Sequence, residues 1–356
     1  MGRPHARPGL VIVSADVVTD PGVPAVRATG PSDAPPDVAG QVAPAYGGRR
    51  LQPAYYLPDH VPAEVARYAG VPDMLPAGSP GKVGILDLRF ERTTNGTELV
   101  AHYQKSPLQI MRPLYYDPLR QDMPYVYLMS TGAGILQGDR LRTDLSFGPG
   151  TSAYVTTTAY TRVLRMEQDY AVALIDVDAA EHAYVEYMPE PLVLFVDSRL
   201  YQRTRLTVAE SATVVAGETL VAGRLAHGER HRYAALAADL EISRPDGTCL
   251  AVDRVRLTPT DRGTGGLAVL ADHDVLAMLY VVTPLASAAD LADLLHAELA
   301  GAEGVVLGVS ALPGDVGVWV RILGDATEPV AHATALAWRA LRLRLTGRPA
   351  PVVRKT

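Results

Sequence analysis

Apolar and polar residues begin to alternate at Gly84, and this pattern predicts β-strands through most of the chain that follows. Leu86, Leu88 and Phe90 alternate with charged residues, as expected for a strand with one buried face. The dipeptide Asn95-Gly96 favours a tight hairpin turn, so we expect the segments 86–91 and 98–103 to pair.

Three later segments resemble one another and predict a repeating unit. Their alanines stand 30 and 29 residues apart, in the runs Thr151–Val155, Glu181–Val185 and Glu210–Val214. Each run follows a short turn and an apolar segment, which are 145–147, 172–177 and 206–208. Units of about 30 residues built as strand, turn and strand favour layers that bury each other's faces. The alternative is an ordinary antiparallel sandwich with evenly spaced turns.

The last third of the chain predicts two α-helices around a hairpin. Ser287 with Asp290 is typical of a helix start, and leucines at 291, 294, 295 and 299 share one face before Gly301. A second helix is expected from a Thr327 cap to Gly347, and the segments 305–311 and 316–323 between the helices predict a hairpin. The predicted fold is therefore mostly β, a β-helix-like stack of antiparallel strands with two C-terminal helices.

The first 80 residues differ from the rest in holding fourteen of the 28 prolines. Proline removes backbone donors and fixes φ, so helix and sheet are both disfavoured there. We expect 1–80 to be a largely disordered extension and 81–356 to be one β domain. Within the extension, Val65 and Tyr68 belong to a short apolar stretch that could dock on the core.

Composition argues against nucleic-acid and membrane partners and indicates where in the cell the protein is located. A net charge of −6 gives no basic surface for nucleic acid or anionic membrane, and no apolar run approaches the length of a membrane span. The stretch Leu10–Val13 is too short for a secretory signal, and Cys249 is the sole cysteine. We expect a cytoplasmic protein whose lone thiol is a half-buried strand residue.

Two motifs that suggest enzymes at first sight lack essential residues. The glycine-rich loop 132–138 is followed by Asp139 and Arg140, whereas a phosphate-binding loop needs Lys and then Ser or Thr. Its glycines instead indicate close backbone approach or positive φ. The segment His227–His231 has its glutamate one place late for a zinc protease, and Gly228 disfavours a helix.

Six acidic residues lie in apolar or glycine-rich stretches, where carboxylates seldom lie without a partner or a task. They are Asp139, Glu186, Glu190, Asp197, Glu218 and Glu229. For most of them the simplest interpretation is an ion pair with a nearby arginine, for which Arg199, Arg203, Arg205 and Arg224 are available.

Four segments, taken in chain order, resemble motifs of the urease accessory protein family UreD, called UreH in some lineages. They are the glycine-rich segment 131–140, the Thr-Thr-containing run 156–166, the segment 187–199 around Pro189-Glu190 and Phe195, and the segment 223–229 from Gly223-Arg224 to Gly228-Glu229. The resemblance covers about residues 81–346. The chain departs from the family pattern at Ala133, Leu164 and Pro189 and in its long extension.

The resemblance implies a non-catalytic scaffold that works with UreF and the GTPase UreG on the urease structural subunits. It also implies an internal tunnel that carries Ni²⁺ to the empty urease active site, with no permanently bound cofactor. Carboxylates exchange nickel more readily than imidazole or thiolate, which suits transient passage.

Asp139, Glu190 and Glu229 are the predicted carboxylates of such a nickel path. Asp139 and Glu229 each follow a glycine, and Glu190 lies between two prolines. Two alternatives remain open at this point: a passive β-rich binding module without metal transit, and a carboxylate-based hydrolase on a β-helix scaffold.

Overall fold

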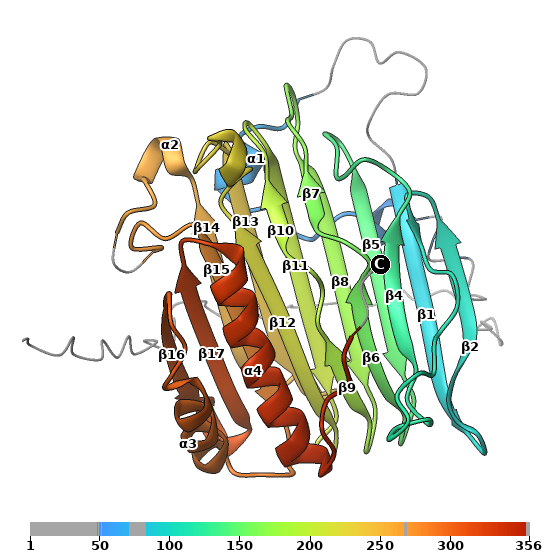
Figure 1. Cartoon of the computed structure of the whole chain (residues 1–356). Coiled ribbons are helices and arrows are strands. Elements are labelled where there is room, and N and C mark those ends of the chain that lie inside the picture. The colour runs from blue at the N-terminus through green and yellow to red at the C-terminus, as the bar shows by residue number, and fades with distance from the viewer. Residues whose placement is uncertain (1–47, 49, 51, 71–82, 267–268, 354–356) are drawn as a thin grey trace, which may run out of the picture. The chain divides into compact units, whose positions relative to one another are not determined.

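The computed structural model describes residues 48, 50, 52–70, 83–266 and 269–353 (Figure 1). The chain divides into two units, Met1–Tyr55 and Tyr56–Thr356. In the first unit the described residues form a short 3-10 helix, η2 (Pro53–Tyr55). All elements that follow belong to the second unit.

Two β-sheets form the framework of the second unit, and the central strands of each run parallel. The seven-stranded sheet has the order β14 (Cys249–Leu257), β13 (Ala235–Ser243), β11 (Arg199–Val208), β8 (Ala171–Ala179), β5 (Arg140–Phe147), β1 (Val83–Thr93) and β2 (Gly96–Lys105). The ten-stranded sheet has the order β16 (Val305–Ala311), β17 (Gly317–Gly324), β15 (Val275–Val282), β12 (Thr213–Val221), β9 (Tyr184–Tyr187), β6 (Ser152–Thr157), β4 (Tyr125–Ser130) and β3 (Leu108–Gln109). Two short strands, β7 (Thr161–Val163) and β10 (Leu192–Leu194), join it at β12.

Successive turns of the chain place one strand in each sheet, which confirms the predicted layering. The strands β5, β8 and β11 pair in parallel, and so do β6, β9 and β12 in the other sheet. The stack is therefore like a β-solenoid, closed at its ends by antiparallel strands, and the simple antiparallel sandwich is wrong. The antiparallel direction predicted for the stacked strands is also wrong, because equivalent strands of successive turns of a solenoid run in the same direction.

The register of the repeats differs from the sequence alignment in one step. The second and third repeats pair as aligned, since Thr213 N donates to Ala183 O. The first and second are shifted by two residues, because Ala153 pairs with Val185 and not with Ala183. A shift of two keeps every side chain on its predicted face, so the apolar pattern alone did not distinguish the two registers.

The main hydrophobic core lies between the two sheets, as alternation along the strands predicts. Residues such as Leu88 on β1, Val177 on β8 and Val214 on β12 contribute to it from both sides. A second core lies between the ten-stranded sheet and the two long helices, α3 (Ala288–Leu299) and α4 (Thr327–Thr346). Figure 1 shows both helices on this face of the sheet.

The predicted hairpins and helix ends are largely confirmed. Thr93 pairs with Gly96 at the β1–β2 turn, and β16 pairs with β17. Ser287 caps α3 by accepting from Asp290 N at 3.1 Å, and Gly347 ends α4 with φ 67°. The Thr327 cap is wrong: Ala326 holds the cap position without a side-chain bond. Pro329 in the first turn removes one N–H group that a cap would satisfy.

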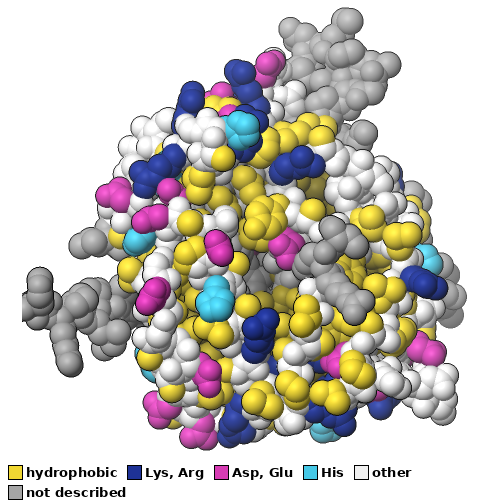
Figure 2. All heavy atoms as spheres, viewed as in Figure 1, with side chains coloured by type: hydrophobic (Ala, Val, Ile, Leu, Met, Phe, Trp, Pro, Cys, Tyr) yellow, Lys and Arg dark blue, Asp and Glu magenta, His cyan; other side chains and the backbone are white. Residues whose placement is uncertain are grey.

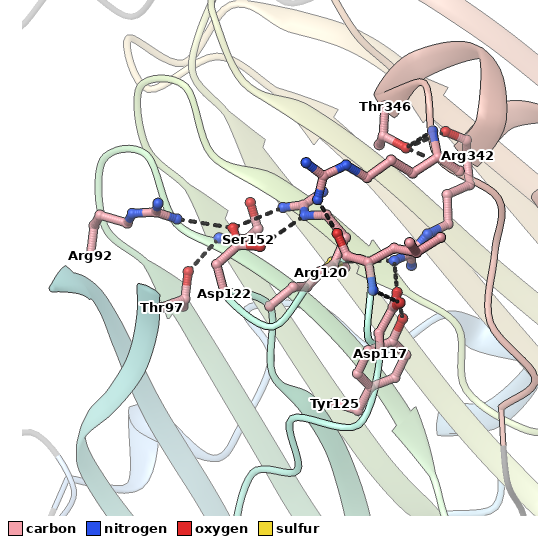
Figure 3. A network of polar contacts seen from close by, with 12 residues as sticks. Arg92, Thr97, Asp117, Arg120, Asp122, Tyr125, Ser152, Arg342 and Thr346 are labelled. Atoms are coloured by element: carbon pink, nitrogen blue, oxygen red, sulfur yellow. Dashed lines mark hydrogen bonds and ion pairs between the residues drawn. The ribbon is translucent and has the colours of Figure 1, made fainter. Parts of the chain in front are cut away.

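Arg342 fixes α4 to the ten-stranded sheet through a fully buried ionic cluster. Its guanidinium lies 2.8 Å from Asp117 Oδ2 and 2.8 Å from Glu186 Oε2. Tyr125 also donates to Asp117, at 3.1 Å, and Tyr184 to Glu186, at 2.6 Å. Figure 3 shows Arg342 and Tyr125 converging on the Asp117 carboxylate.

A short arm packs on the outer face of the seven-stranded sheet. It contains α1 (Ala63–Ala66), and Val65 is fully buried against Leu174 and Tyr201, with Tyr68 packed beside it. The docked arm that the sequence allowed is therefore present over these residues. Most of the predicted extension, 1–47 and 71–80, lies outside the described residues. No helix within the described ranges is long and apolar enough to span a membrane.

Three other small elements belong to the second unit, and one sequence prediction fails near them. The helix α2 (Pro259–Arg262) follows β14, and the 3-10 helices η3 (Leu225–His227) and η4 (Pro313–Asp315) lie in connections. Cys249 is exposed and not half-buried. It is the first residue of β14, an edge strand with no partner beyond it among the described residues.

Candidate functional site

The four motif segments, separate in sequence, lie beside one another in the loops that connect the strands of successive layers. Ile135 N donates to Arg162 O at 2.7 Å, and Phe195 N donates to Val163 O at 3.0 Å. Asp197 N in turn donates to Arg232 O at 2.9 Å, which joins the third segment to the loop that follows Gly223-Arg224. The solenoid winding explains this arrangement, because equivalent loops of successive layers stack directly.

Glycines in these loops permit close backbone contacts, as the sequence predicted. Gly134 has φ 155°, and a Cβ there would overlap the carbonyl oxygen of Arg162. Gly223 has φ 143°, and a Cβ there would overlap the carbonyl oxygen of Glu229. A side chain at either position would force the loops apart.

A cavity of about 200 Å³ lies between the two sheets and reaches the motif loops. Loop residues line its outer part, including Gly132, Gly134, Tyr160, Arg162 and Glu190. Tyr160 and Arg162 are exposed, whereas the deeper lining belongs to the core, so the cavity leads from the loops into the sandwich. Apolar side chains dominate the deeper lining, and the polar ones there are Thr143, Gln202, Thr204, Glu218 and Thr219.

Glu218 is the acidic residue of the inner lining. It extends from β12, and Gln202 on β11 of the opposite sheet donates through Nε2 to its Oε1. Burial, and after it the charge of Asp253, raise the pKa of Glu218 from its ordinary 4.5 to about 7, against the lowering effect of the Gln202 hydrogen bond. This carboxyl is therefore divided between its protonated and charged forms near neutral pH.

Asp253 bridges the sheets beside Glu218. It extends from β14 and accepts from Tyr280 on β15 at 2.6 Å and from Arg321 on β17 at 2.9 Å. The guanidinium compensates the charge of Asp253, whereas Glu218 forms no ion pair with any residue that the structure describes. A cation in the cavity would supply that missing charge.

Of the three carboxylates predicted for a metal path, Glu190 lines the cavity. Its backbone N donates to Thr157 Oγ1 at 2.9 Å, which fixes it beside the Thr-Thr motif. Glu190 and Glu218 thus bring two carboxylates to one cavity, from a loop and from a strand.

The other two predicted carboxylates stabilise loops outside the cavity lining. Asp139 Oδ2 accepts from Leu136 N at 2.9 Å and so closes the glycine-rich turn. Glu229 is paired with Arg224 and also accepts from Val196 N at 3.4 Å. The Arg224 hydrogen bond holds the pKa of Glu229 below its ordinary value.

The remaining acidic candidates follow the simple ion-pair interpretation. Glu186 is paired with Arg342, and Asp197 lies 3.3 Å from Arg165 at the surface. The sequence carried one further signal for Glu218. It stands in the series Val214, Ala216, Glu218 and Leu220, whose other members face the main core, so alternation places its carboxyl inward.

In the segment His227–His231, the second histidine is partly buried and lies beside an acidic side chain. Burial lowers the pKa of His231 more than nearby Asp274, 3.1 Å from its Nε2, raises it. Within the part of the chain that the structure describes, no three His, Cys, Asp or Glu side chains are grouped so as to hold a metal ion.

Comparison with known proteins decides the family. The profile of the family "UreD urease accessory protein" matches residues 82–356. A Streptomyces griseus subsp. griseus protein named urease accessory protein UreD 2 is 55% identical over 293 residues, covering 82% of this chain and all of the relative. This chain belongs to the UreD family.

More distant UreD proteins match over the same region. The Haloarcula marismortui urease accessory protein UreD is 37% identical, covering 78% of this chain and 92% of its own length. A Brucella suis biovar 1 protein named urease accessory protein UreD 2 is 32% identical, covering 81% and 96%. The motif loops and the cavity both lie within the segment that matches the UreD profile.

Proposed function

We propose that this UreD-family protein is a non-catalytic urease maturation factor that passes Ni²⁺ to apo-urease through the cavity between its sheets. UreF and the GTPase UreG are its proposed partners, together with the urease structural subunits. The observation that carries the proposal is Glu218, a carboxyl held in the interior of a cavity that reaches the motif loops.

The volume and chemistry of the cavity suit a small cation. One water takes about 30 Å³ of liquid volume, so a cavity of about 200 Å³ accommodates an ion with several waters. Oxygen ligands hold Ni²⁺ less tightly than imidazole or thiolate, and water with two carboxylates would let the ion leave again. Glu190 near the loops and Glu218 further in supply those carboxylates.

Proton exchange at Glu218 favours transfer of the cation through the cavity over its storage there. A carboxyl with pKa about 7 gives up its proton at little cost when a divalent cation arrives, and takes it back when the cation leaves. The proton and the cation would thus alternate as the partner of this carboxyl. The sequence also predicted Asp139 and Glu229, in the adjoining loops, as carboxylates of the path, and variants of these two residues test that prediction separately.

Reconstitution of urease maturation tests the proposal. Apo-urease, UreF, UreG, GTP and Ni²⁺ are combined with or without this protein, and nickel per urease active site is measured after size-exclusion chromatography. We expect a joint complex and nickel loading only when the protein is present. Nickel loading that is equal without the protein, although the complex forms, would instead support a passive binding module.

A further inference from the structure

The main strand orders of the two sheets end at four edge strands among the described residues, and β16 differs from the other three. The ten-stranded sheet ends at β16 and at β3, which has only two residues. The seven-stranded sheet ends at β14, which carries Asp253, Arg254 and Arg256, and at β2, which carries Glu98 and Lys105. Charged side chains and short length are the usual protections of a sheet edge against pairing with another chain.

β16 has neither protection. Its sequence is Val-Val-Leu-Gly-Val-Ser-Ala over Val305–Ala311, without a charge or a proline, and it pairs on one side with β17. An edge strand presents a row of backbone donors and acceptors to another chain. With seven residues, β16 is long enough to pair with an additional strand.

The two faces of β16 differ: one packs on the core and the other is open. Val305, Leu307 and Val309 pack against the core under the helices, so the strand is held in place. On the opposite face Val306 is 59% exposed, and a Cβ added at Gly308 would meet open space. An incoming strand would therefore extend a sheet that is already fixed.

The surroundings of this edge are acidic. α3, which packs over β16, exposes Asp290, Asp293 and Glu298, and Glu303 is exposed just before the strand. Figure 2 shows acidic side chains gathered at the lower left, over α3. Asp290 forms a long, exposed ion pair with Arg344, at 3.9 Å.

We propose that β16 accepts an extended segment of another protein as an eleventh strand of this sheet, one whose centre is uncharged and whose ends carry Lys or Arg. The backbone supplies the pairing, and the acidic residues of α3 and Glu303 select basic flanks. A second copy of this chain fits poorly, because symmetric pairing of two β16 strands would bring two acidic α3 helices together.

A peptide of this chemistry tests the proposal on the full-length protein. The probe is fluorescently labelled Lys-Thr-Val-Thr-Val-Thr-Val-Lys with blocked ends, and binding is read by anisotropy. One comparison peptide has Glu at both ends, and another has a central Pro. Deuterium exchange of residues 305–311 is measured with and without the probe, with β14 as the internal reference.

Two matched variants separate edge pairing from general adhesion. Val306→Lys places a charge on this edge, and Val252→Lys makes the same change on exposed β14. We expect Val306→Lys to weaken binding of the basic peptide at least tenfold with an unchanged melting temperature, and Val252→Lys to have little effect. Exchange at 305–311 should slow only with the basic, proline-free peptide.

Three results would overturn this inference. They are equal binding by Val306→Lys, equal or better binding of the acidic-flanked peptide, and a concentration-dependent dimer that Val306→Lys abolishes, which would make a second copy the occupant. The assay contains neither nickel nor urease, so its failure would leave the proposed maturation function unaffected.

Discussion

Arg342 Nη1 lies 2.8 Å from Glu186 Oε2, although 156 residues separate them in sequence. Both side chains are fully buried, and the contact joins the last helix to the middle of the ten-stranded sheet. Because Asp117 shares the same guanidinium, one arginine compensates two buried carboxylates. α4 is therefore held by charge as well as by its apolar face.

Replacing Arg342 by Ala should destabilise the fold by about 3–5 kcal/mol, because two buried carboxylates would lose their counter-charge. Urea denaturation measures the change. Arg344→Ala is the matched control, since its pair with Asp290 is exposed, and it should cost less than about 1 kcal/mol. A loss below 1 kcal/mol for Arg342→Ala would show that α4 is held by its apolar contacts alone.

Two glycines of one motif should differ sharply when changed to Ala. At Gly223 a Cβ would overlap the Glu229 carbonyl, so Gly223→Ala should cost more than about 3 kcal/mol or prevent folding. At Gly228 φ is 71° but nothing lies near, so Gly228→Ala should cost about 1 kcal/mol. Thermal unfolding of both variants checks this, and similar losses would contradict the close approach seen at Gly223.

Local sequence signals predicted the parts of this fold that depend on neighbouring residues. The Asn95-Gly96 hairpin, the Ser287 cap and the 30-residue spacing of the layers all follow from short patterns. The two-residue register shift between the first two repeats could not be predicted, because either register buries the same side chains.

The candidate site was predictable only in part, for a related reason. Motif resemblance indicated Glu190, which lines the cavity, but it favoured Asp139 and Glu229, whose partners lie within their own loops. Glu218 was noticed among acidic residues in apolar stretches, yet its environment depends on Gln202 and Asp253 from the opposite sheet. Such long-range contacts leave no local pattern in the sequence.

Glu218 should make stability fall as pH rises. Its pKa is 4.5 ordinarily and about 7 in the fold, so between these values the folded state keeps a proton that the unfolded state has lost. Stability should therefore decline through this window by up to about 3 kcal/mol relative to Glu218→Gln, and level off above pH 7. Denaturation experiments measure the free energy of unfolding of both proteins against pH. Parallel profiles would refute the raised pKa of Glu218 in the fold.

Asp139 and Glu229 should act mainly on the loops that they stabilise. Asp139→Ala and Glu229→Ala each remove a hydrogen-bonded acceptor, and we expect losses of about 1–3 kcal/mol. Nickel per urease active site, measured in whatever complex still assembles, should stay at the wild-type level. Reduced nickel at normal complex recovery would instead support the path role that the sequence predicted for these two residues.

Nickel per urease active site after maturation with Glu218→Gln tests the central proposal most directly. Glutamine has nearly the same shape but cannot carry the charge that a cation in the cavity would need. Glu241→Gln is the matched control, because that carboxylate is paired with Arg205 and does not line the cavity. Complex recovery is measured on the same chromatography run, so that loss of assembly is separated from loss of transfer. The proposal predicts normal recovery of both variants, with nickel content reduced at least tenfold for Glu218→Gln and unchanged for Glu241→Gln, and a normal nickel content with Glu218→Gln would contradict it.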